Sequence, residues 1–157
     1  MENEQIIRKE LADMINKGNA HATFEDAVKN ISKENRTKVP EKLPYSLWQL
    51  IEHIRIAQWD IIEFCKNPDH QSPEWPKEYW VDNLEPTDEQ WNNTLNTIRQ
   101  DRNDFLEYLA DLNNHLYKPF NHGNGQNLLR EAMLISDHNA YHTGEIIILR
   151  RLLNDWK

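Results

Sequence analysis

The amino-acid sequence predicts an all-α protein built as a four-helix bundle. Apolar residues recur at helical spacing over four long intervals of the 157-residue chain. Glycine and proline lie almost entirely in the segments between these intervals. One such segment, residues 67–86, spans roughly 60 Å when extended, which is more than the length of a helix. It can therefore return the chain along the whole bundle, so that the second and third long helices run parallel.

The first long helix is expected from Glu2 to about Lys17, where a glycine and an asparagine at residues 18–19 end it. Thr23 is the expected N-cap of a short helix that follows. Both helices place apolar residues on one side: Ile7, Leu11, Met14 and Ile15 in the first, and Phe24, Ala27, Val28 and Ile31 in the second. Residues 30–41 are polar and charged, which predicts a connection.

The second long helix begins at a capping box, with Ser46 as N-cap and Gln49 three residues later. It continues to about Lys66 with apolar residues at heptad-like spacing: Leu47, Leu50, Ile54, Ala57, Ile61 and Phe64. His53 borders this seam. A histidine at the edge of a core is more often hydrogen-bonded than bound to metal, so His53 alone does not predict a site.

Four prolines and the aromatic residues Trp75, Tyr79 and Trp80 make residues 67–86 an ordered crossover. A second capping box, at residues 87–90, starts the third long helix. Its apolar seam is interrupted only by Arg102: Trp91, Leu95, Ile98, Phe105, Leu109 and Leu112. Residues 113–126 are expected to form a loop. The fourth long helix starts between Asn124 and Leu128 and runs to about Leu153.

Composition predicts a single domain over residues 1–157, because this length supports one sizeable core. A formal net charge of −8 argues against nucleic acid as a partner, since that would require a basic face. The only cysteine, Cys65, excludes an internal disulfide, suits a cytoplasmic protein and is expected to pack in the core. No apolar run is long enough to predict a membrane span, and the first residues do not resemble a signal peptide.

The segment Asp137–Glu145 holds the candidate site. His138 and His142 are four residues apart, so their rings share one helix face and can bind one divalent metal ion together. Glu145 falls on the same stripe, among apolar residues expected to face the core: Leu128, Ile135, Leu149 and Leu152. A hydrogen-bonded histidine pair is the alternative. The metallopeptidase signature is absent, because Asn139 stands where it requires glutamate.

The topology adds a third histidine to this pair. If the second and third long helices are parallel, the second opposes the fourth, and the depth of His53 in the bundle roughly matches that of His138 and His142. The three histidines are therefore expected to converge near one end of the bundle, with His70 and His122 toward the other. Facing helices of such bundles commonly build metal sites in this way.

Three segments, Pro44–His53, Ile56–Asp60 and Asp137–Gly144, resemble the DinB-like (DinB/YfiT) superfamily, and the aromatic pairs of the crossover resemble one of its subgroups. The resemblance implies a bundle of up-down-down-up order, often a homodimer. It also implies a divalent metal ion, typically zinc or nickel, on His53, His138 and His142. Characterised relatives include thiol-dependent S-transferases. Glu145 departs from the pattern, because related chains of the subgroup commonly have glutamine there.

Three imidazoles leave coordination positions open, which is typical of a catalytic metal. Together with the resemblance, which implies a low-molecular-weight thiol, this leads us to expect an S-transferase or a hydrolase acting on a small soluble substrate. The alternative is a noncatalytic protein that binds metal or a small ligand in a stress response.

Glu145 is expected to act as a general base on a water at the metal; direct ligation and an outward contact with Arg102 are the alternatives. Trp48 and Tyr141 are further candidates for the mouth of the site, although core packing is the more ordinary explanation for an aromatic residue. Arg55, Arg150 and Arg151 are candidates for binding an anionic substrate, although an exposed salt bridge is the more ordinary explanation for each.

Overall fold

The computed structural model describes residues 2–41 and 43–156. Over these residues it contains helices and no strand, with one isolated bridge between Pro119 and Asn127. The elements in chain order are α1 (Glu2–Lys17), α2 (Phe24–Val28), η1 (Lys33–Asn35), α3 (Leu47–Lys66), η2 (Lys77–Tyr79), α4 (Asp88–Ala110) and α5 (Leu128–Leu152). The predicted all-α fold is confirmed.

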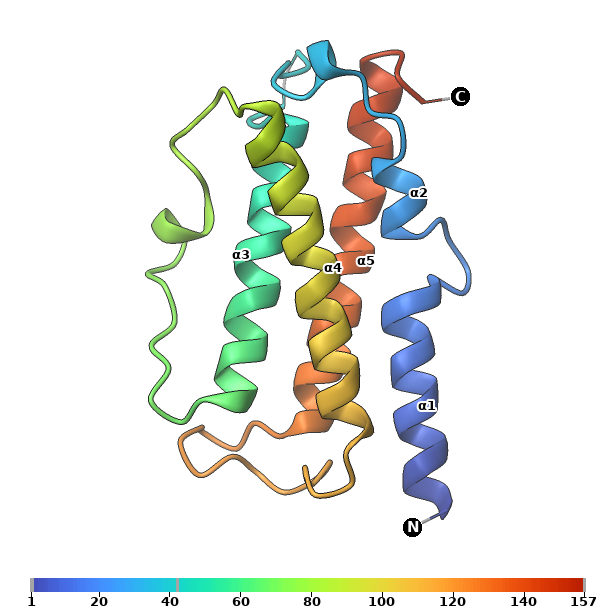
Figure 1. Ribbon diagram of the computed structural model, residues 1–157, viewed down its shortest axis with the longest axis vertical. Helices are drawn as coiled ribbons and strands as arrows, with labels where there is room; N and C mark the ends of the chain where they lie inside the picture. Colours follow the sequence, from blue (N-terminus) through green and yellow to red (C-terminus); the bar gives the residue numbers. More distant parts are fainter. Residues whose placement is uncertain (1, 42, 157) are drawn as a thin grey trace.

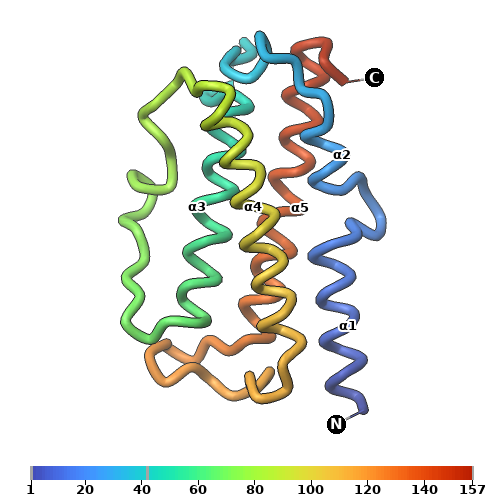
Figure 2. Tube along the Cα trace, in the orientation of Figure 1, coloured from blue at the N-terminus to red at the C-terminus, as the bar shows by residue number. Residues whose placement is uncertain are grey.

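The helices run up, down, down and up, as predicted. Figure 1 shows α1 and α5 running in one direction, with α3 and α4 parallel to each other in the opposite direction. The short helix α2 continues the column that α1 begins. Residues 67–87 pass along the outer side of α3 to reach the start of α4, which Figure 2 shows as the green segment on the left. This crossover covers α3 on the side where the candidate histidine lies.

Local capping determines where the helices begin. Ser46 accepts the N–H of Gln49, whose side chain accepts the N–H of Ser46 in return, and Thr87 and Gln90 do the same. Asn127 caps α5. Helix α4 ends at Ala110, two residues before the predicted end. The reason is Asp111, whose backbone is extended and whose carboxylate accepts the N–H of Asn113, forming a turn in place of another helical turn.

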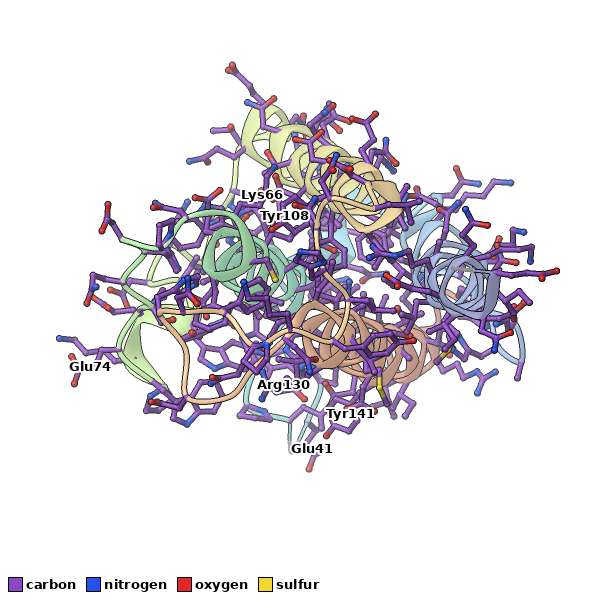
Figure 3. All side chains as sticks on the ribbon, turned by 90° about the horizontal axis from the view of Figure 1, so that it is seen from below. Glu41, Lys66, Glu74, Tyr108, Arg130 and Tyr141 are labelled. Atoms are coloured by element: carbon purple, nitrogen blue, oxygen red, sulfur yellow. The ribbon has the colours of Figure 1, made fainter. Side chains whose placement is uncertain are left out.

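The core consists of two apolar clusters along the bundle. One lies around α2 and the neighbouring parts of α3, α4 and α5, with Leu47, Ile54 and Ile146 fully buried. The other lies toward the opposite end, around Phe105 and Leu128. Figure 3, seen along the bundle, shows the long helices packed around these interiors.

The prediction that Leu152 faces the core is wrong, since its side chain is 55% exposed. Leu149 is buried, and Leu153, which is partly buried, packs against the core. A straight helix turns every 3.6 residues, so a seam counted at 3.5 residues drifts away from the core toward the helix end. Of the helices described, none combines the length and the apolar character that crossing a membrane requires.

Candidate metal centre

Three histidines from two helices meet between α3 and α5. His53 of α3 and His142 of α5 are buried, and His138 of α5 is partly buried. One nitrogen from each ring lies within 4.8 Å of those of the other two. The Nε2 atoms of His53 and His138 are 3.2 Å apart. The structure thus brings together the three residues that the sequence predicts as metal ligands.

The opposite nitrogen of each ring faces an oxygen. The Nδ1 atom of His53 lies 3.0 Å from the backbone carbonyl of Tyr79, and that of His142 lies 2.6 Å from Oε2 of Glu145. The Nδ1 atom of His138 lies 3.4 Å from Oδ1 of Asn139. Carbonyl and carboxylate oxygens accept hydrogen bonds, so Nδ1 of each ring is placed to donate one, which leaves Nε2 as the nitrogen available for a metal ion. Oxygen partners of this kind orient metal-binding histidines in proteins.

The spacing of the rings fits one divalent ion. Zinc–nitrogen bonds of about 2.0–2.1 Å in a tetrahedral arrangement place two ligand nitrogens about 3.3 Å apart, close to the separation of His53 and His138. Burial lowers the pKa of His53, and burial together with the neighbouring histidines lowers the pKa of His138 to about 4. These two rings are therefore neutral at neutral pH, the form that binds metal. Two lone pairs that face each other at this distance favour a cation between them.

The crossover holds His53 from outside the bundle. The ring of Trp80 stacks on that of His53, with centroids 4.4 Å apart and planes at 4°. The ring of Tyr45 stacks in turn on that of Trp80, with centroids 5.1 Å apart. The hydroxyl of Tyr79 donates to Oδ2 of Asp60 at 2.6 Å, which ties the crossover to α3. Sequence reasoning missed the Tyr79 carbonyl, because a backbone oxygen leaves no signal in a sequence.

A pair of amide side chains, Gln58 and Asn139, supports His138 from the other side. The side chain of Asn139 donates to Oε1 of Gln58 at 2.8 Å, and Gln58 donates in turn to the carbonyl of Ile98 in α4 at 2.8 Å. Gln58 is only 1% exposed. This pair links α3, α4 and α5 directly behind the histidines. Sequence reasoning missed it as well; a glutamine at a core-facing position of an apolar helix is the signal that identifies it.

Glu145 lies beside the histidines. Its Oε2 atom faces Nδ1 of His142, and its Oε1 atom accepts the hydroxyl of Tyr45 at 2.8 Å. Arg102 instead pairs with Glu25 at 3.0 Å. The contacts of the carboxylate are thus those of a group that orients His142.

The other candidates have separate partners. His70 pairs with Asp60 at 2.8 Å, and His122 lies 2.8 Å from the carbonyl of Phe64, so neither joins the cluster. Cys65 is buried among apolar residues, as predicted, and burial raises its pKa. Trp48 lies outside the site: it is buried, and its indole N–H donates to the carbonyl of Asn83 at 2.8 Å.

The candidate arginines also lie away from the histidines. Arg55 pairs with Glu52 at 2.8 Å. Arg150 is buried and donates to the carbonyl of Ala27 at 2.8 Å, so the expectation of an exposed side chain is wrong for it. Arg151 is exposed near the end of α5. These side chains therefore provide no positive charge to the site.

A cavity of about 590 Å³ opens beside the three histidines. Its walls come from α3, α5 and the crossover, with Tyr45 from the segment before α3. Tyr141 lines it and is 65% exposed, so it takes the candidate position at the mouth, and core packing, the more ordinary explanation, is wrong for it. The cavity is the size of a small-molecule site.

Comparison with known proteins identifies one family. The family described as the DinB superfamily matches residues 19–146, which is most of the chain and includes all three histidines. Neither the curated proteins nor the solved structures contain a match.

Proposed function

Because the chain belongs to the DinB superfamily, and because its three histidines converge beside a cavity, we propose that it is a divalent-metal-dependent enzyme for a small soluble substrate. The reaction is thiol-dependent S-transfer or hydrolysis. The observation that carries this proposal is the arrangement of the imidazoles, each with one nitrogen directed at an oxygen and the other left for a metal ion.

His53, His138 and His142 are the proposed ligands, and zinc or nickel is the proposed ion, since imidazole suits both. A divalent ion on three imidazoles keeps a coordination position open and supplies Lewis acidity, which lowers the pKa of a water or thiol. The protein's own groups do the remaining work. Tyr79 and Asn139 orient two of the rings, and Trp80 covers His53 from solvent.

Glu145 has two proposed tasks. Its contact with Nδ1 of His142 orients that ring and raises the basicity of the free nitrogen. Its carboxylate also lines the cavity, where it is placed to accept a proton from a reacting group as a general base. The hydroxyl of Tyr45 holds the carboxylate in this position from the opposite side.

The test is turnover by protein purified without a metal-affinity tag. The metal content is measured first, and the protein is then assayed with low-molecular-weight thiols plus electrophiles, and with a panel of esters. We expect turnover that a chelator abolishes and that zinc or nickel restores. Bound metal without turnover over the whole panel would favour the noncatalytic alternative. Protein that takes up no metal would contradict the metal-dependent enzyme and leave only a noncatalytic protein that binds a small ligand. The homodimer and the cytoplasmic location stay predictions from the sequence.

Removal of the metal should leave the fold intact while lowering its thermal stability. Each large apolar side chain in the two core clusters contributes about 1.5–3 kcal/mol on burial, independently of any metal. An ion that binds only the native state at 100 to 1,000 times its Kd adds about 2.7–4.1 kcal/mol. For a chain of this size that corresponds to about 5–15 °C in Tm.

Circular dichroism with and without chelator measures both effects. The helical signal at room temperature should be unchanged, and the melting transition should move down by this amount. Loss of the helical signal on chelation would mean that the metal is needed for the fold.

A further inference from the structure

The walls of the cavity are aromatic. Trp75, Tyr79 and Trp80 come from the crossover, and Tyr141 comes from α5. Trp75 is 69% exposed and Tyr141 is 65% exposed, although both are large. Figure 3 shows Tyr141 on the side of α5 that faces away from α4. Exposed aromatic rings from two separate segments at one cavity indicate a surface that a bound molecule covers.

The charges around the cavity are all negative. Asp60, Asp137 and Glu145 line it, and the described residues place no lysine or arginine in its lining. The hydrogen-bond partners of Asp60 are the side chains of His70 and Tyr79. Those of Glu145 are the side chains of His142 and Tyr45.

The acidic excess persists when a metal is bound. Three carboxylates outnumber the two positive charges of a divalent ion. An anionic substrate would therefore meet like charge at the walls and find no basic partner there.

We propose that this cavity selects a small organic cation, a substituted ammonium group on an apolar or aromatic body. Aromatic faces attract such cations through the ring quadrupole, and nearby carboxylates add a charge attraction. Asp137 is the carboxylate best placed for this contact, because it is exposed and the described residues offer it no hydrogen-bond or salt-bridge partner. This proposal rests on the proposed function, because it names the class of substrate that the same site would bind.

Three probes of similar size separate charge from shape: benzyltrimethylammonium, benzyl alcohol and phenylmethanesulfonate. The quaternary nitrogen has no lone pair, so this cation cannot ligate a metal ion, and its binding reports on the cavity walls. Titration followed by tryptophan fluorescence, in both zinc-loaded and metal-free protein, gives the affinities. We expect the cation to bind at least about tenfold more tightly than the sulfonate in both forms.

Variants connect this preference to the cavity. Asp137→Asn should weaken binding of the cation by about threefold or more and leave that of benzyl alcohol unchanged. Trp75→Ala should weaken both. Asp82→Asn is the matched control, because Asp82 is an exposed acid of the crossover outside the cavity lining. It should have no effect.

Three results would overturn the proposal: no binding of the cation, sulfonate binding as tight as that of the cation, or an unchanged preference in Asp137→Asn. Metal analysis of the same samples separates this inference from the proposed function. Cation selectivity in a protein that takes up no metal would contradict only the proposed enzyme. A metal-loaded protein without cation selectivity would contradict only this inference.

Discussion

His53→Ala should abolish tight metal binding. This change removes one of three proposed ligands, the only one on α3, and leaves His138 and His142 as a pair on one helix. Loss of an outer hydrogen-bond partner alone costs metal affinity roughly 10–100-fold, so loss of a ligand should cost more. The ring also bridges the Trp80 stack and the Tyr79 carbonyl, and both contacts disappear with it. Metal content after purification without a tag, and competition titration with a chromogenic chelator, measure the change.

His70→Ala and His122→Ala are the matched controls for this prediction. Both remove a hydrogen-bonded histidine near the far end of α3, and neither belongs to the cluster. Their metal content should equal that of the unaltered protein. Full occupancy in His53→Ala together with loss in either control would show that the site assignment is wrong.

Glu145→Ala and Glu145→Gln should have different effects, which separate the two proposed tasks of this residue. Alanine leaves Nδ1 of His142 without its acceptor, so metal affinity should fall about 10–100-fold. Glutamine keeps an acceptor oxygen and loses only the charge, so the metal should remain bound. A carboxylate that also acts as general base predicts that turnover of Glu145→Gln falls by about tenfold or more.

Nitrogen NMR of the His142 ring provides a readout that does not need a substrate. Its Nδ1 proton should persist in Glu145→Gln and exchange faster in Glu145→Ala. Tyr45→Phe is the control, since it removes the second contact of the carboxylate and leaves His142 paired. Full turnover in Glu145→Gln would limit Glu145 to positioning, whereas loss of metal in that variant would indicate that the carboxylate is itself a ligand.

Most of the predictions that the structure confirms rest on interactions between residues near one another in the chain. The capping boxes at Ser46 and Thr87 involve residues three apart, and they place the starts of α3 and α4 correctly. The pairing of His138 with His142 follows from helical spacing alone. The parallel course of α3 and α4 required only the length of the crossover, because a shorter connection could not reach back along the bundle.

What determines the chemistry of the cavity is the contact between distant segments, which the tertiary structure alone decided. The Tyr79 carbonyl and the Trp80 stack reach His53 only after the crossover has folded onto α3, and Asn139 meets Gln58 only after α5 has packed against α3. The same packing directs Arg150 to the carbonyl of Ala27, and among the described residues no lysine or arginine lines the cavity. Helical periodicity assigns a side chain to a face. Its partner across that face depends on the crossing of the helices and the path of the connection, which no local pattern encodes.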